Sequence, residues 1–265
     1  MAWLAPDDKF DPDTIDNDVI GIASELAWHD SGMHTHLMGQ LLFSQAGCMR
    51  ITLDDSVYML PPLRVAWIPP RQPHRVHVSA AVGYRSVYLS DRYAATLPHK
   101  VEVLCASRLL SELLERIACA AFDTHWEEGP AARLLAVCGD EIAQAPRELT
   151  QLPLPSDRRI RALAHADTLP PLHLLAQRVG ATEKTISRLF RKDTGLSYQQ
   201  WRQQWRLIKA IELLARGERQ ADIAEQLGFS GDSAFITFFK HTVGMPPRAY
   251  MAAHYSEPAP KARPH

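Results

Sequence analysis

One structural unit is written twice in the C-terminal part of the sequence, and this repeat limits the possible folds more than any other feature. The first copy is "LAQRVGATEKTISRLFRKDTGLS", residues 175–197, and the second is "IAEQLGFSGDSAFITFFKHTVGMPP", residues 223–247. Apolar positions coincide at an offset of 48 residues, which becomes 49 after one extra residue near 229–231. A short helix, a turn with glycine and a second helix form a helix-turn-helix.

The residues at each turn have a physical role. Gly180 and Gly228 supply the positive φ that ends the first helix of each unit. Thr182 and Ser230 are side chains that favour the N-cap of the helix that follows. Two copies with the same internal chemistry predict two helix-turn-helix units.

The segment between the two copies, "SYQQWRQQWRLIKAIELLARG", predicts one continuous helix that ends at Gly217. About 19 residues at a rise of 1.5 Å give a rod of about 28 Å. One turn of B-DNA is about 34 Å, so such a rod would hold two recognition helices in successive major grooves.

The charge of the chain is divided unevenly. Residues 1–155 hold 12 Lys and Arg against 20 Asp and Glu, whereas residues 156–255 hold 15 against 9. A basic C-terminal half beside an acidic N-terminal half predicts that the two halves have different partners, one of them a polyanion.

The remaining chain predicts an α+β multidomain fold. Residues 18–90 contain short β-branched and aromatic runs separated by Gly, Pro and Asp, which is typical of a small sandwich or barrel. Two helices should follow at 107–122, with Ser107 as N-cap, and at 130–145. We therefore expect one domain at 1–145, an irregular proline-containing linker at 146–156, an all-α domain at 157–255 and a disordered tail at 256–265.

The C-terminal hundred residues resemble the DNA-binding domain of the AraC/XylS family of bacterial transcription regulators. The motifs "SDRRIRALAHAD", "ISRLFRKDTGLSYQQWRQQWRLIKAIELL" and "IAEQLGFSGDSAFITFFKHTVGMPPRAY" carry this resemblance, which covers roughly 156–255. It implies promoter DNA as a partner, a cupin-like effector domain at the N-terminus, and a homodimer formed through the helices of residues 107–145. The resemblance also implies RNA polymerase as a possible partner.

The resemblance places the base-reading positions of the first recognition helix, about 183–192, at Lys184, Ser187 and Arg188. These three share one face, and Arg188 is the best candidate because a guanidinium binds guanine O6 and N7 together. Thr182, Arg191 and Lys192 suit phosphate contacts. The alternative is that these side chains only solvate an exposed face.

The second recognition helix, about 232–241, carries Asp232, Ser233 and Thr237 at the family's base-reading positions, with no Arg, Lys or Gln among them. We expect the first helix to dominate base reading and the second to add phosphate contacts through Ser230 and Lys240.

Histidines mark the N-terminal half. "HTHLMGQ" places His34, His36 and Gln40 close together, and His74 follows Pro69 by five residues. These stretches resemble the two cupin motifs, in which three His and a Glu bind a divalent ion, although Gln40 replaces the Glu here. Three imidazoles suit Zn²⁺, Fe²⁺ or Ni²⁺.

Three interpretations of these histidines stay open: a metal site made by His34, His36, Gln40 and His74, a pocket for an organic effector, or ordinary polar residues inside a barrel. Trp28, Trp67 and Tyr88 are candidates for an aromatic wall of an effector pocket, with Trp67 the residue chosen for the site, although an aromatic residue on a strand is more often part of the core.

The predicted function is a ligand-responsive transcription regulator without enzymatic activity. The alternative is a metal-dependent cupin enzyme fused to a DNA-binding anchor. The four cysteines form no C-x-x-C pair, no apolar run is long enough to span a bilayer, and the N-terminus lacks a basic-then-apolar leader. We therefore expect a cytoplasmic protein.

Overall fold

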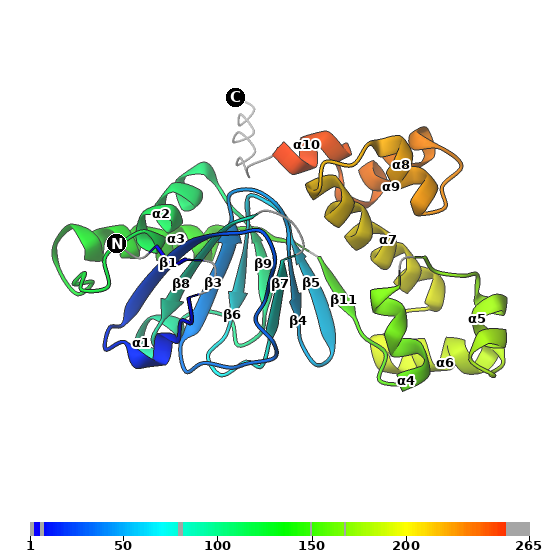
Figure 1. Cartoon of the computed structure of the whole chain (residues 1–265), viewed down its shortest axis with the longest axis horizontal. Helices are drawn as coiled ribbons and strands as arrows, with labels where there is room; N and C mark the ends of the chain where they lie inside the picture. The colour runs from blue at the N-terminus through cyan, green and yellow to red at the C-terminus, as the bar shows by residue number, and fades with distance from the viewer. Residues whose placement is uncertain (1–2, 6–7, 79–81, 149, 167, 253–265) are drawn as a thin grey trace, which may run out of the picture.

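A computed structural model describes residues 3–5, 8–78, 82–148, 150–166 and 168–252 of the chain. Its N-terminal domain contains two antiparallel sheets that face each other (Figure 1). The strands of the first sheet, in spatial order, are β1 (Val19–Leu26), β8 (Val82–Leu89), β3 (Gly39–Ser44), β6 (Arg64–Ile68), β9 (Glu102–Cys105) and β10 (Arg147–Glu148).

The second sheet is the one that lies next to the helical domain, and we call it the docking sheet. Its strands in spatial order are β11 (Gln151–Pro153), β5 (Ser56–Leu60), β4 (Met49–Thr52), β7 (Arg75–Val78) and β2 (His29–Asp30). Side chains from both sheets, such as Leu42 and Ala66 facing Ile51 and Val76, form the core between them.

Two helices cover the outer face of the first sheet. They are α2 (Arg108–Ala118) and α3 (Gly129–Gln144), and a short α1 (Asp91–Ala94) precedes them. The Ser107 side chain accepts from Leu110 N at 2.9 Å, so the predicted N-cap is confirmed. The expected fold class, an antiparallel β domain followed by helices, is confirmed.

The segment 146–156 is not an irregular linker throughout, contrary to the prediction. Arg147 and Glu148 pair with β9, and residues 151–153 pair with β5. Both pairings lie at sheet edges, where a proline such as Pro153 is tolerated because its missing N–H is not needed. The predicted tail at 256–265 lies outside the described residues.

The C-terminal domain is helical. Its elements are α4 (Arg158–Arg161), η2 (Ala162–His165), α5 (Leu172–Arg178), α6 (Glu183–Thr194), α7 (Tyr198–Ala215), α8 (Gln220–Gln226), α9 (Asp232–Val243) and α10 (Pro247–Ala252); η1 (Pro12–Thr14) lies in the N-terminal domain. Gly180 and Gly228 have φ of 64° and 70°, so each predicted turn has the backbone that glycine permits.

The helix α7 joins the pair α5–α6 to the pair α8–α9 (Figure 1). Its 18 residues correspond to a rod of about 27 Å, close to the predicted length. Ser197 and Gln200 form a capping box at its start. In the described part of the chain, no helix is both long and apolar enough to cross a membrane.

Candidate functional site

The first recognition helix, α6, presents its predicted DNA-contacting side chains to solvent. Ile186 and Phe190 are fully buried on the inner face, which fixes the rotation of the helix. Lys184 and Arg188 are exposed and Ser187 is half-buried on the outer face. Thr182 accepts from Thr185 N at 3.2 Å and so caps the helix.

The second recognition helix, α9, begins differently. Its N-cap is Gly231, and Ser230, predicted as the cap, makes no capping hydrogen bond. The extra residue in this copy of the turn moves Ser230 one position outside the helix, which is the physical reason for the error. Asp232 instead accepts from the Ser233 backbone N–H at 2.8 Å.

The basic side chains on both recognition helices have no protein partner. In the part of the chain that the structure describes, none of them makes an ion pair or a side-chain hydrogen bond, and all are exposed: Lys184, Arg188, Arg191, Lys192 and Lys240. Ser230, Ser233 and Thr237 are exposed as well. Their individual contacts with DNA stay predictions.

Arg206 on α7 is a positioning residue that the sequence did not indicate. Its guanidinium lies 4.9 Å from the centroid of the Phe229 ring and donates to Gly228 O at 3.4 Å. These contacts fix the turn between α8 and α9 against the rod. In the sequence, the four-residue spacing of Arg202 and Arg206 indicates only that both lie on one face of α7. It does not indicate that Arg206 contacts Phe229.

A chamber of about 610 Å³ opens into the N-terminal domain between the two sheets. We call this cavity the effector chamber. Its walls come from β1, β2, β3, β7 and β8, and residues of the segment 4–13 close one side. A cavity of this size suits a small ligand.

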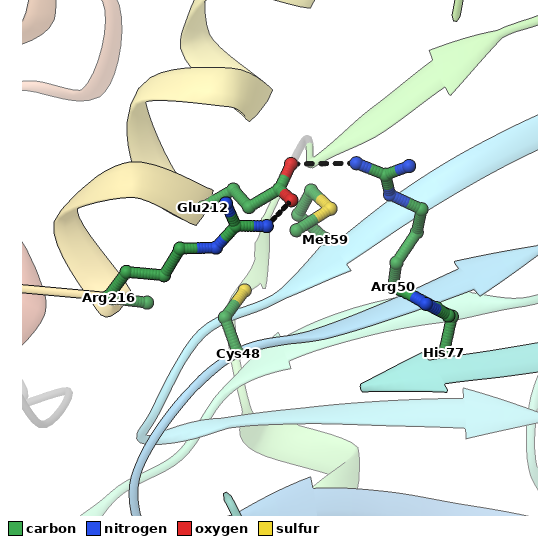
Figure 2. A pocket seen from close by; sticks show the side chains of 7 residues that line it. Cys48, Arg50, Met59, His77, Glu212 and Arg216 are labelled. Atoms are coloured by element: carbon green, nitrogen blue, oxygen red, sulfur yellow. Dashed lines mark hydrogen bonds and ion pairs between the residues drawn. The ribbon is translucent and has the colours of Figure 1, made fainter. Parts of the chain in front are cut away.

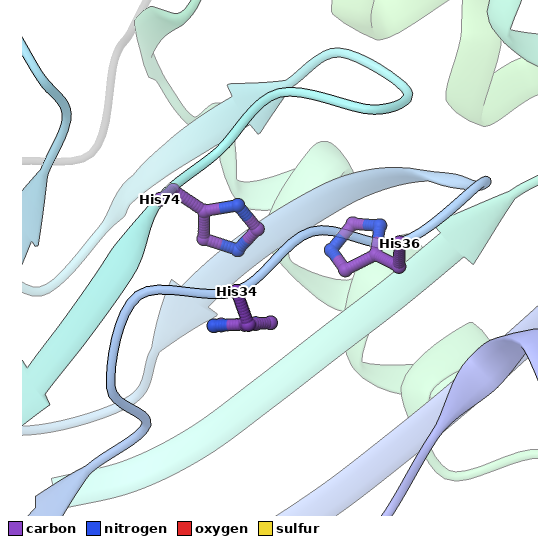
Figure 3. Close-up of side chains that lie close together, drawn as sticks. All are labelled: His34, His36 and His74. Atoms are coloured by element: carbon purple, nitrogen blue, oxygen red, sulfur yellow. The ribbon is translucent and has the colours of Figure 1, made fainter.

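Three imidazoles lie close together (Figure 3), and two of them, those of His34 and His36, line the effector chamber. One nitrogen from each of His34, His36 and His74 lies within 4.8 Å of the others. An isolated bridge pairs the backbones of His34 and His74, which explains why residues 40 positions apart become neighbours. The sequence prediction that these histidines cluster is therefore in agreement with the structure.

The proton of each imidazole is fixed by the backbone. The Nδ1 atoms of His34 and His74 lie 3.1 Å from Gly32 O and 2.8 Å from Gln72 O, and Nδ1 of His36 bonds to Met38 O. Because a carbonyl oxygen only accepts, each Nδ1 carries a hydrogen, and Nε2 is the nitrogen that keeps the lone pair when the ring is neutral. Burial lowers the pKa of His36 and lowers that of His74 to about 4, so both rings are neutral near pH 7.

Gln40 points its carbonyl oxygen at this cluster. Its Nε2 donates to the hydroxyls of Tyr84, Ser86 and Tyr88, which are on the same face of β8 because they alternate along the strand. The amide oxygen is consequently left 3.4 Å from His36 Nε2. The lone pairs of His36 Nε2 and Gln40 Oε1 therefore face each other, and a cation bound between them would remove their repulsion.

The rim of the effector chamber is also rich in acceptors. Asp8, Asp11 and Asp13 line it, and within the described residues none of the three forms an ion pair. Lys9 is the single Lys or Arg of its described lining. This excess of carboxylates over cationic side chains in the lining favours a ligand that carries positive charge.

Trp67 does not belong to the effector chamber, so this predicted effector residue is wrong. It pairs with Leu41 on the outer face of the first sheet, lies in the core below α2 and α3, and donates from Nε1 to Pro98 O at 2.7 Å. Trp28 is 68% exposed and lies edge-on to His77, outside the chamber. Tyr88 does line the chamber, as predicted.

Comparisons with known proteins match both domains. A family model described as an AraC-like ligand-binding domain matches residues 16–135, and a helix-turn-helix domain model matches residues 175–253. The HTH-type transcriptional regulator NimR of Escherichia coli K12 is 33% identical over 227 residues, which cover 84% of this chain and 82% of NimR.

Solved structures with similar chains include both single domains and whole proteins. The DNA-binding domain of AdpA, solved with a target DNA, is 30% identical and covers 34% of this chain and 83% of its own, with a TM-score of 0.31. ToxT of Vibrio cholerae, solved with an unsaturated fatty acid, is 11% identical and covers 90% of this chain and 97% of its own, with a TM-score of 0.35.

Proposed function

The chain belongs to the AraC/XylS family of transcription regulators, and from this premise we propose that an effector held in the effector chamber sets its occupancy of promoter DNA. The chamber carries this proposal, because it lies in the domain that matches a ligand-binding family and its lining holds Asp8, Asp11 and Asp13, which form no ion pair within the described residues. A ligand changes DNA binding only if its affinity differs between the two states of the protein.

The first test concerns the DNA. Sites selected from random duplexes by the full chain should show protection by footprinting over two successive major grooves on one side. Protection confined to half a helical turn for each protomer would contradict the tandem use of α6 and α9.

A divalent metal ion is the second candidate for the effector. Three clustered imidazoles, together with the Gln40 oxygen, form a ligand set that fits Zn²⁺, Fe²⁺ or Ni²⁺. Among the described residues, the buried Nε2 of His74 has no hydrogen-bond partner, which also supports a bound cation. The ion would act by holding the strands that carry these ligands together.

The metal proposal predicts stoichiometric binding. Protein purified without chelating resin and analysed by mass spectrometry of its metals should hold about one ion per chain. Metal contents far below one ion per chain after reconstitution with each of the three metals would exclude the metal effector and the metal-dependent enzyme together. The absence of a carboxylate at position 40 already argues against the enzyme, and the matched relatives are regulators.

A homodimer through α2 and α3 is a further proposal. Leu109 is 51% exposed and Val137 is 42% exposed on these helices, and an apolar contact between two copies would cover such side chains. Sedimentation of L109D should give a lighter species than the wild-type chain, whereas an unchanged mass would refute this interface. A contact with RNA polymerase stays a prediction.

A further inference from the structure

The docking sheet packs its outer face on the helix that joins the two DNA-reading units. Val57 and Met59 of β5 and Leu152 beside them share one buried cluster with Trp201 and Trp205 of α7. Trp201 Nε1 also donates to Pro153 O at 2.6 Å. The N-terminal domain is therefore attached directly to the rod that spaces α6 and α9.

One ion pair crosses this contact at the other end of the rod (Figure 2). Arg50 of β4 donates from Nη2 to Glu212 Oε2 at 2.7 Å. Glu212 is buried. Lys209 of its own helix and Arg216, the C-cap of that helix, lie 3.5 Å and 2.5 Å from its carboxylate. Desolvation opposes the charge of Glu212, but Arg50 and these two cations together lower its pKa.

Arg50 is the half of this contact that belongs to the N-terminal domain. It has no other ion-pair or hydrogen-bond partner among the described residues, whereas Glu212 would keep Lys209 and Arg216 if the domains separated. The contact consequently contributes to docking and little to the fold of either domain.

The strand next to Arg50, β7, and the strand beyond it, β2, form part of the wall of the effector chamber. Arg50 lies opposite His77 of β7, and His77 lies opposite Asp30 of β2. Asp30 and Val76 line the chamber. A ligand that moves β7, directly or through β2, therefore moves the strand that pairs with Arg50.

We propose that the Arg50–Glu212 pair is a latch that holds the two domains together in a state with lower affinity for DNA. The inference rests on the proposed function and specifies how the chamber reaches the DNA-reading helices. The direction follows from charge: the latch keeps a domain with 20 acidic and 12 basic residues beside one with 15 basic and 9 acidic. An adjacent acidic body opposes the approach of phosphates, so release should raise affinity.

The test compares R50M with R92M in the full chain. Arg92 pairs with Asp18 and Glu127 inside the N-terminal domain, so R92M removes the same charge without touching α7. On DNA selected by the wild-type chain, fluorescence anisotropy at low salt should give at least threefold tighter binding for R50M than for R92M. The ratio should shrink as salt rises, because salt screens the repulsion.

Three further measurements make the result specific to the pair. R50K should behave like the wild-type chain, and R50M should have no added effect in an E212Q background, because coupled residues are not additive. Small-angle scattering should give a larger radius of gyration for R50M than for R92M.

Two failures can be told apart. If R50M binds DNA no more tightly than R92M and the two variants have the same radius of gyration, the latch is overturned, whereas the proposed promoter binding is not affected. Absence of specific DNA binding by the wild-type chain would overturn the proposed function instead. In that case an R50M radius equal to that of R92M would also show that Arg50 does not hold the domains together.

Discussion

His74 has a completely buried side chain whose Nδ1 is paired with a backbone carbonyl and whose Nε2 has no partner. A buried acceptor without a partner costs about 1–3 kcal/mol relative to one that is satisfied. The neighbouring residues do not relieve this cost, because His34 and His36 present acceptor nitrogens of their own. At the scale of single residues, the three histidines present acceptor nitrogens that a hydrogen-bond donor or a cation would satisfy.

We therefore expect H74A to lower the affinity for Zn²⁺ at least tenfold, and Q40E to raise it, because a carboxylate binds a divalent ion better than an amide. Competition with a chromophoric chelator measures both effects. H99A is the matched control, since His99 is exposed and lies outside the cluster. Equal affinities for H74A and H99A would contradict the site.

Base reading is the second prediction at this scale. R188A should lose about 1–3 kcal/mol of binding to the selected DNA and less to a scrambled duplex, because a bidentate contact to guanine is lost. T237A should lose clearly less specificity. Anisotropy titrations on both duplexes measure the difference, and comparable losses from the two variants would refute the dominance of α6.

K192A serves as the control for this comparison. A phosphate contact carries no sequence information, so its loss should weaken binding to both duplexes alike and reduce the salt dependence by about one charge.

Some of these residues were predictable from the sequence and others were not. The cluster was predicted from the spacing of His34 and His36 and from the resemblance of His74 to the second cupin motif. In the structure His34 and His36 lie outside the named strands, and the isolated bridge between His34 and His74 brings the two segments together. The alternation of side chains along a strand did not place Trp67, because every residue of β3 and β6 is buried and both faces of the first sheet are covered. Burial on both faces removes the pattern that distinguishes the inner side from the outer one.

At the scale of elements, the two recognition helices differ in how they begin. Thr182 caps α6 with a hydrogen bond to Thr185 N, whereas α9 has no side-chain cap. The sequence predicted both helices correctly, because their apolar positions and glycines repeat. It did not predict the N-cap of α9. The extra residue near Gly231 shifts the start of the helix by one position, and the pattern of apolar residues does not show this shift.

This difference has a measurable consequence for stability. T182A should destabilise the helical domain by about 1 kcal/mol, the usual effect of removing a threonine cap, whereas S230A should change it by less than about 0.5 kcal/mol. Thermal unfolding followed by circular dichroism without DNA should show a lower midpoint for T182A alone. A larger shift for S230A would show that the cap has been assigned to the wrong residue.

At the scale of the whole molecule, the predicted linker is part of the structure that joins the domains. Leu152 and Leu154 are 1% and 6% exposed and lie in the cluster that contains Trp201. Three prolines and the lack of periodicity pointed to an irregular segment, and sequence patterns do not reveal burial that a distant helix provides. The residues of β11 and α7 that touch are about 50 positions apart in the sequence, so no local pattern indicates their contact.

The last prediction follows from this contact and concerns the helical domain alone. A fragment of residues 151–265 should be more stable than one of residues 157–265 by about 2 kcal/mol, because two leucines remain buried on α7. The Pro153 carbonyl that accepts from Trp201 is kept in the longer fragment as well. Urea unfolding followed by tryptophan fluorescence compares the two, and replacing both leucines by serine in the longer fragment should remove its advantage. Equal midpoints for the two fragments would contradict this prediction. They would mean that residues 151–156 pack on α7 only when β11 is paired with β5 in the full chain.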